Sequence, residues 1–172
     1  KIIRIANTDS SVLIWGESGT GKELVAQSLH TASNRKNKKF VSQNCAAIPS
    51  TLLESILFGT TKGSFTGAEN RAGIFEVANG GTIFLDEINS MGMDVQAKIL
   101  KAIEEKQIKR IGGVEPISID VKIVAAMNAD PIECVKNKII REDLFYRLSV
   151  VQIKVPPLRE RQADLFFLID YF

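Results

Sequence analysis

The sequence predicts an α/β domain in which a parallel five-stranded sheet is sandwiched by helices. Short apolar or β-branched segments alternate along the chain with longer segments of helical character, which is typical of strand–helix–strand units. The length of 172 residues suits one such domain with a single buried core. The candidate strands are Val12–Trp15, Phe40–Ser42, Thr82–Leu85, Val121–Ala125 and Val151–Lys154.

Helices are expected in the intervals between these strands. In one of them Met93, Ala97, Leu100 and Ile103 recur at helical spacing, which predicts a face turned towards the core. Two prolines end the last strand, and a further helix is expected to begin near Gln162. The candidate helices are Lys22–Thr31, Ser50–Leu57, Met93–Glu105, Pro131–Lys138 and Arg141–Leu148.

Composition and charge exclude several classes of protein. The net charge of +2 is too small for a DNA-wrapping or membrane-binding surface, and no apolar stretch of about 18 residues predicts a membrane span. We therefore expect a cytoplasmic protein without membrane contact. Cys45 and Cys134 lie far apart and are expected to be reduced thiols, while the single histidine, His30, is expected at the surface or at a helix end.

A glycine-rich segment predicts a phosphate-binding loop. It matches G-x-x-x-x-G-K, follows the apolar strand that ends at Trp15, and leads into a helical segment. Backbone N–H groups of such a loop converge on phosphate oxygens, and Lys22 supplies a charge at the β- and γ-phosphates of ATP. The usual Ser or Thr after the lysine, a Mg²⁺ ligand, is Glu23 here, so Thr20 or Ser18 is left to offer a hydroxyl. The predicted nucleotide-binding residues are Gly16, Glu17, Ser18, Gly19, Thr20, Gly21, Lys22 and Glu23.

Two carboxylates follow the apolar strand 82–85. A continuous apolar run suits a strand buried on both faces, whose carboxyl end opens on the ligand crevice of a parallel sheet. We expect Asp86 to hold Mg²⁺ through water and Glu87 to polarise the attacking water.

A polar loop carrying one phenylalanine interrupts the alternation of strands and helices. It runs over residues 59–68, is punctuated by glycines and matches no core-forming pattern, which indicates a functional role.

Seven segments in this order resemble the central domain of sigma-54-dependent transcription activators, which belong to the AAA+ P-loop NTPases. The resemblance runs from about Val12 to the end of the chain, and Glu commonly follows the phosphate-loop lysine in that family. The segments are GESGTGKE (16–23), NCAAIP (44–49), LLESILFG (52–59), KGSFTGA (62–68), GGTIFLDEI (80–88), REDLFYRL (141–148) and PPLRER (156–161).

The resemblance implies a loop that contacts sigma-54 when ATP is bound. The family loop usually reads GAFTGA, so Ser64 replaces an alanine here, whereas Phe65 and Thr66 are retained. The expected partner is the sigma-54 RNA polymerase holoenzyme. The residues of this loop are Gly63, Ser64, Phe65, Thr66, Gly67 and Ala68, called the 63–68 loop below.

Further roles are implied position by position. Asn44 would hold Glu87 idle until the nucleotide changes, and Asn128 would be the first sensor residue, although the family more often has Thr where Met127 stands. Arg141 and Arg147 would act as arginine fingers in the ATP site of a neighbouring subunit, which implies a ring, expected to be a hexamer.

The resemblance also implies a helical lid with a second sensor arginine and a helix-turn-helix domain that binds DNA. Neither is found within residues 1–172, so the whole sequence is interpreted as one AAA+ domain that is truncated at its C-terminus.

Two alternatives remain: another AAA+ machine such as an unfoldase, helicase loader or chelatase subunit, and a nucleotide-binding regulator without turnover. A direct DNA-binding module is not supported, because the sequence has no basic stripe and no recognisable helix-turn-helix.

Overall fold

The computed structural model describes residues 5–162 and 164 and contains the expected parallel sheet. All four neighbouring strand pairs of this sheet are parallel, in the order β2-β5-β8-β1-β9. The central strand β8 and its two neighbours β5 and β1 are almost entirely buried, which explains their continuous apolar sequences. The strands are β1 (Val12–Trp15), β2 (Phe40–Asn44), β5 (Thr82–Asp86), β8 (Lys122–Met127) and β9 (Val151–Lys154).

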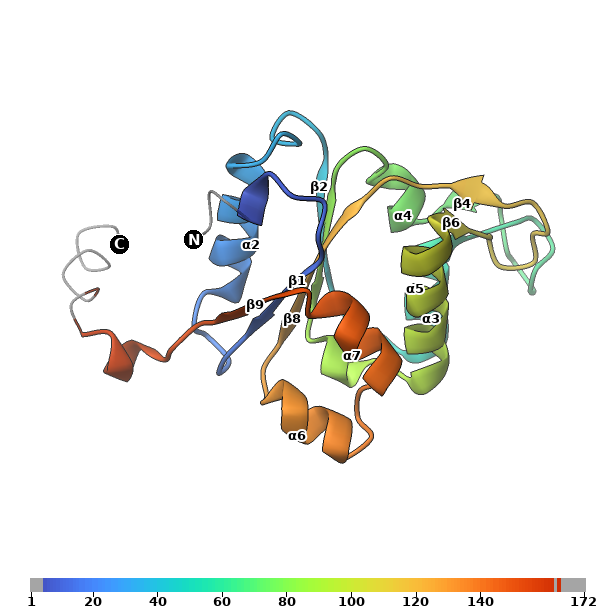
Figure 1. Cartoon of the computed structure of the whole chain (residues 1–172). Helices are drawn as coiled ribbons and strands as arrows, with labels where there is room; N and C mark the ends of the chain where they lie inside the picture. The colour runs from blue at the N-terminus through green and yellow to red at the C-terminus, as the bar shows by residue number, and fades with distance from the viewer. Residues whose placement is uncertain (1–4, 163, 165–172) are drawn as a thin grey trace.

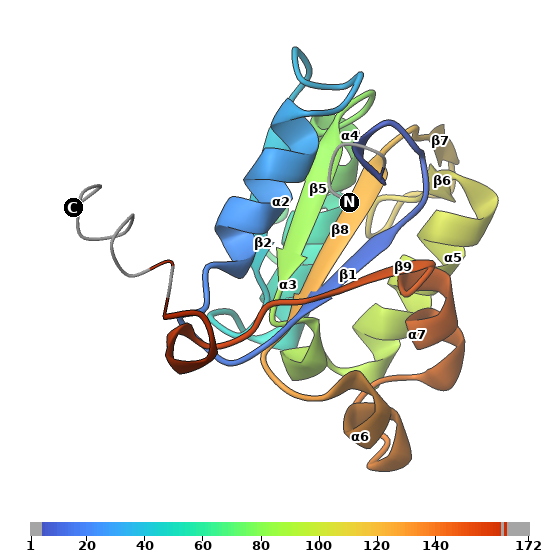
Figure 2. The same cartoon turned by 60° about the vertical axis from the view of Figure 1, so that its left-hand side comes forward.

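Helices cover both faces of the sheet (Figures 1 and 2). On one face α2 (Lys22–Thr31) packs Ala26 and Leu29 against alternate residues of β1 and β8. The opposite residues of the same strands form a larger core with the remaining helices. These helices are α3 (Ser50–Phe58), α4 (Ile74–Val77), α5 (Met93–Glu105), α6 (Pro131–Lys136) and α7 (Glu142–Leu148).

The predicted buried face of α5 was correct only in part, because Leu100 and Ile103 pack against the core but Met93 does not. Met93 is 40% exposed, whereas Val95, Ile99 and Ala102 are buried together with Gln96. Apolar residues lie on two adjacent faces of this helix, and packing against α7 and the sheet selects the one centred on Ile99. Leu100 and Ile103 flank that face and are only partly buried.

His30 is in the last turn of α2, as expected, but it is not at the surface. Its ring is buried at 8% exposure, and Nδ1 lies 2.9 Å from the hydroxyl of Thr82 in β5. Cys45 and Cys134 are both free, as predicted, and the structure shows that both are buried.

Two small hairpins were not predicted, and they project side by side from the sheet (Figure 1). One pairs β3 (Gly59–Thr60) with β4 (Arg71–Ala72), and the other pairs β6 (Gln107–Ile108) with β7 (Ile117–Ser118). A bridge between Thr60 and Ile111 joins the two. Two single turns, η1 (Ile88–Ser90) and η2 (Leu158–Glu160), complete the described structure.

Within residues 5–162 and 164, no helix has the length and apolar character needed to cross a membrane. The helix expected to begin near Gln162 lies outside the described residues.

Candidate nucleotide-binding site

The phosphate-binding loop connects β1 to α2 as the sequence predicts. Lys22 is the first residue of α2 and is 7% exposed. Its Nζ donates hydrogen bonds of 2.9 Å to the carbonyl oxygens of Gly16 and Glu17, while the Thr20 hydroxyl donates one of 2.8 Å to Glu17. The loop therefore folds around its own lysine and leads directly into the N-terminus of a ten-residue helix, where backbone N–H groups favour an anion.

Gly16 is required by a close approach of the chain after β9. A Cβ at this position would lie 2.3 Å from the carbonyl oxygen of Val155, which is closer than any side chain can accept. The N–H of Gly16 also donates to the carbonyl of Met127, so the start of the loop is held between the ends of β8 and β9.

The acidic pair lies at the carboxyl end of β5. Oδ1 of Asp86 accepts a hydrogen bond of 2.9 Å from the N–H of Glu87. Glu87 has a φ of 53°, a left-handed conformation that is uncommon for a residue with a side chain. Strained backbone of this kind often accompanies a functional residue, because the surrounding structure must stabilise it.

Sheet register brings the two candidate asparagines to the same edge. Asn44 ends β2 directly opposite Asp86, and Asn128 follows β8 beside the strand that leads into the phosphate-binding loop. Lys22, Asp86 and Glu87 thus share one end of the sheet with both asparagines.

In this conformation the Asn44 side chain does not make the expected interaction with Glu87. Oδ1 of Asn44 accepts hydrogen bonds from the backbone N–H groups of Ala46 and Ala47, at 2.9 and 3.3 Å. The side chain therefore caps its own turn, and its role as a switch stays a prediction.

Cys45 borders this site but is not a nucleophile. The pKa of its thiol is raised to about 12, chiefly by burial and additionally by the nearby carboxylates of Asp86 and Glu87. The thiol therefore stays protonated at neutral pH and acts as a small buried side chain.

Two arginines of the segment 156–161 lie against the phosphate-binding loop, and no role for either could be predicted from the sequence. Arg159 forms a paired contact with the carboxylate of Glu17, with Nη1 at 2.8 Å from Oε2. Nη2 of Arg161 donates a hydrogen bond of 2.6 Å to the carbonyl of Thr20. PPLRER was recognised as a characteristic segment, but only the folded chain shows that it closes over this loop.

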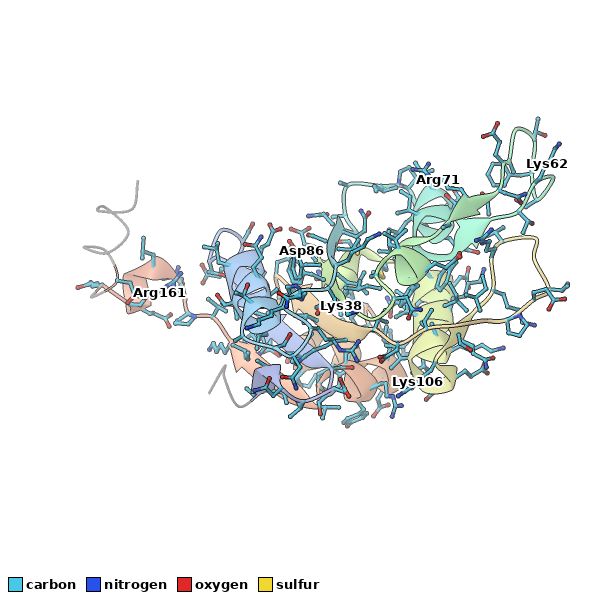
Figure 3. The ribbon with its side chains drawn as sticks, turned by 90° about the horizontal axis from the view of Figure 1, so that it is seen from above. Lys38, Lys62, Arg71, Asp86, Lys106 and Arg161 are labelled. Atoms are coloured by element: carbon cyan, nitrogen blue, oxygen red, sulfur yellow. The ribbon has the colours of Figure 1, made fainter. Side chains whose placement is uncertain are left out.

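The 63–68 loop lies at the tip of the β3–β4 hairpin, with residues 65–67 exposed and Ala68 buried. Phe65 is 54% exposed, and Thr66 is exposed beside it. The N–H of Gly63 donates to the carbonyl of Ala68 at 3.3 Å, which closes the base of the loop. In a view from above, Asp86 lies between Lys62, next to this loop, and Arg161 on the opposite side of the molecule (Figure 3).

Ser64 anchors the loop to its neighbour. Its Oγ is buried, and no residue among those described bonds to it. A Cβ on Gly112 would lie 2.5 Å from the Cβ of Ser64, so the neighbouring loop 109–116 packs closely against this position.

Arg141 and Arg147 do not join the nucleotide site of their own chain. Arg141 precedes α7 and forms a paired contact with Asp143, at 2.7 and 3.0 Å. Arg147, in the last turn of α7, lines a cavity of about 350 Å³ with Ser11, Val121 and other residues that precede the strands. The phosphate-binding loop follows β1, so Arg147 lies at the opposite end of the sheet.

Comparison with known proteins agrees with these features. Residues 1–154 match the family model of the Sigma-54 interaction domain. The transcriptional activator RocR of Bacillus subtilis is 55% identical over 169 residues, which cover 98% of this chain and 37% of RocR. The regulatory protein AtoC of Escherichia coli is 51% identical over 170 residues, again 98% of this chain and 37% of the relative. The chain thus spans little more than a third of the length of these relatives.

Solved structures show the same fold. A crystal structure of NtrX from Brucella abortus in complex with ATP has a TM-score of 0.90 and 39% identity, covering 99% of this chain and 38% of NtrX. A P-loop NTPase domain of a sigma-54 activator from E. coli has a TM-score of 0.61 at 18% identity, covering 91% of this chain and 90% of that one, and supports the fold alone.

Proposed function

The chain belongs to the Sigma-54 interaction domain family, and from this premise we propose that it hydrolyses ATP to remodel sigma-54 RNA polymerase holoenzyme. The 63–68 loop is the proposed contact with sigma-54, and the result of its movement is opening of the promoter. The observation that carries the proposal is that Lys22, Asp86 and Glu87 share one end of the sheet while an aromatic loop is exposed elsewhere on the same domain.

ATP binding begins with an exchange of partners at Lys22. Its ammonium is satisfied by two neutral carbonyls of the loop, and an anionic phosphate is the stronger acceptor. The triphosphate therefore draws Lys22 from Gly16 and Glu17 and binds against the N-terminus of α2. Relatives support this assignment, since NtrX has been crystallised with ATP.

The acidic pair and Thr20 fit Mg²⁺, the ion that normally accompanies ATP. Magnesium usually takes one or two carboxylates, waters and phosphate oxygens rather than a cage of protein ligands, and the described residues contain no cluster of three or more His, Cys, Asp or Glu side chains. Asp86 uses Oδ1 for the N–H of Glu87 and keeps Oδ2 for a water of the ion. The ion would neutralise charge on the β- and γ-phosphates.

Glu87 is the proposed base that polarises the attacking water. It follows the carboxyl end of β5 in a left-handed backbone conformation, at the point where the chain leaves the strand. Asn128 is proposed to sense the γ-phosphate, and Arg141 and Arg147 to stabilise the transferring phosphoryl group from a neighbouring subunit of a ring.

α3 connects the nucleotide site to the 63–68 loop. It begins six residues after Asn44 and ends at Phe58, next to Gly59, where the β3–β4 hairpin starts. A change at Asn44 would therefore reach Phe65 and Thr66 through one short helix. This continuity favours the proposal over another type of AAA+ machine, which would have no use for an exposed KGSFTGA segment.

Phosphate release tests the enzymatic part of the proposal. Glu87→Ala is expected to reduce ATP turnover by about 10²-fold or more, because general base catalysis contributes roughly 10²–10⁴-fold. The control Glu104→Ala removes an exposed carboxylate of α5 and is expected to leave turnover unchanged. Unchanged turnover in Glu87→Ala would show that the mechanism is wrong and would favour a regulator without turnover.

Thr66→Ala tests the coupling. ATP turnover should be retained, while binding to sigma-54 with a transition-state mimic of ATP, and open-complex formation, should be lost. Thr31→Ala removes an exposed hydroxyl on α2 and should affect neither. Equal loss of turnover and coupling in Thr66→Ala would assign the loop a structural role.

A further inference from the structure

Asn89 contacts the end of a neighbouring strand in a way that the proposed chemistry does not use. It lies in η1, two residues after Glu87, and its Nδ2 donates a hydrogen bond of 2.9 Å to Oδ1 of Asn128. Backbone hydrogen bonds from Ser90 to Glu87 and from Met91 to Ile88 hold this turn. The side chain is thus carried by the same rigid turn that follows Glu87.

This contact fixes which end of the Asn128 amide is free. The oxygen of Asn128 is engaged by Asn89, so the group it presents to other partners is Nδ2, which only donates. A phosphate at neutral pH chiefly accepts hydrogen bonds. The opposite orientation of the amide would turn an oxygen towards the phosphate and would be repelled.

Asn128 is next to the phosphate-binding loop. The N–H of Gly16, the first residue of that loop, donates a hydrogen bond of 3.2 Å to the carbonyl of Met127, the residue before Asn128. The amide oriented by Asn89 therefore stands between the turn after Glu87 and the loop proposed to hold the triphosphate.

The other end of the Asn89 amide also indicates that a ligand or a water molecule binds in this region. Its Oδ1 is buried, and no residue in the described part of the chain donates a hydrogen bond to it. The large majority of buried side-chain polar atoms have a hydrogen-bond partner. A water molecule or a bound ligand accounts for the remaining acceptor.

We infer that Asn89 is a positioning residue for ATP hydrolysis, which holds the Asn128 amide with its NH₂ group directed at the γ-phosphate. The inference rests on the proposed ATPase function and adds a residue for which sequence reasoning gave no role. Asn89 need not contact ATP itself, and its effect is expected on the chemical step rather than on nucleotide affinity.

Asn89→Asp tests this role with almost no change in shape. The carboxylate cannot donate to Oδ1 of Asn128, so the Asn128 amide turns over and presents its oxygen to the phosphate. We expect kcat to fall at least tenfold. The dissociation constant for ATP should change less than threefold when measured by the fluorescence of Trp15, the single tryptophan, one residue before the loop.

Three further variants separate positioning from a structural role. Ser90→Ala changes an exposed residue of the same turn and should leave kcat, affinity and melting temperature unchanged. Asn128→Ala should lower kcat, and Asn89→Asp combined with Asn128→Ala should be no slower than Asn128→Ala alone, since Asn89 acts through Asn128. The inference would be overturned if the fold-losses in kcat of the two single variants multiplied in the double variant. It would also be overturned if Asn89→Asp lost as much affinity for ATP as it lost kcat.

A second measurement does not depend on turnover. The side-chain ¹⁵NH₂ resonances of Asn128 should shift when ATP and Mg²⁺ are added to the wild-type chain, and should not shift in the same way in Asn89→Asp. Identical shifts in both would contradict the inference. A wild-type chain that binds ATP with this shift but releases no phosphate would instead refute the proposed enzymatic function while leaving the positioning intact.

Discussion

The buried imidazole of His30 makes the stability of the fold depend on pH. Burial lowers the pKa of His30, and its Nδ1 is engaged with Thr82 in the centre of the sheet. The unfolded chain takes up a proton near the ordinary value of 6.5, while the folded chain resists it. The neutral imidazole of His30 therefore stabilises the fold fully above pH 6.5. As the pH falls below this value, the free energy of unfolding decreases by no more than about 1.4 kcal/mol per pH unit.

Urea unfolding at pH 7.5 and 5.5 measures this effect. Between these values, the wild-type chain should lose about 1 kcal/mol more of its free energy of unfolding than His30→Gln, which cannot be protonated. Carboxylates contribute equally to both chains, so the difference isolates the histidine. An equal pH dependence in the two chains would show that His30 is protonated in the folded state.

Residues of the site differ in how far the sequence can reveal them. Lys22, Asp86 and Glu87 lie within local patterns of strand, loop and helix, so their common location at the end of the sheet could be predicted. Asn89 and Arg161 owe their positions to partners 39 and 141 residues away in sequence. No local pattern encodes such pairs, and only the folded chain reveals them.

At the scale of elements, the N-terminal segment is fastened to the sheet by one buried lysine. Nζ of Lys122 in β8 donates to the carbonyl oxygens of Ile5, Ala6 and Thr8, at 2.9, 2.8 and 2.7 Å. Burial lowers the pKa of this lysine, and the side chain is only 2% exposed. Three carbonyls at the end of a short turn thus depend on a single ammonium group.

Lys122→Met should release this segment while the sheet persists. Methionine replaces the volume of the stem but leaves three carbonyls without a donor, so we expect a loss of about 2–4 kcal/mol in the free energy of unfolding. Amide hydrogen exchange of residues 5–9 should accelerate, while β1 and β5 stay protected. Lys101→Met, on the exposed side of α5, is the matched control, and equal exchange in both variants would refute the anchor.

Elements with strong local patterns were predicted closely, and those that depend on pairing were not. The bounds of β1, β9, α2 and α5 agree with the sequence prediction. β2 continues two residues further than predicted, because Gln43 and Asn44 pair with β5 although both are polar. The hairpin strands are two residues each and are stabilised by their neighbours, so no periodicity could reveal them.

For the whole molecule, the layered α/β architecture followed from the alternation of elements, but strand order and subunit contacts did not. The order β2-β5-β8-β1-β9 places the phosphate-binding loop at the carboxyl ends of the strands, whereas Arg147 lies with the residues that precede β1, β8 and β9. One chain therefore cannot use its own Arg147 and Lys22 in the same nucleotide site. An arginine finger at this position has to serve a second subunit.

Mixing two inactive variants tests whether Arg147 acts between subunits. Lys22→Ala lacks the phosphate lysine, and Arg147→Ala lacks the finger, so each alone should lose most of its turnover. In an equimolar mixture, an Arg147→Ala subunit next to a Lys22→Ala subunit regains one intact site. Random assembly gives about a quarter of the wild-type sites.

The matched control mixes Lys22→Ala with Glu87→Ala. Lys22 and Glu87 lie at the same end of one sheet and must come from the same chain, so no pairing of these two variants restores a site. Recovery only in the first mixture would establish a site built from two chains. If neither mixture recovers, Arg147 does not act in trans, and the ring would have to be justified by other contacts.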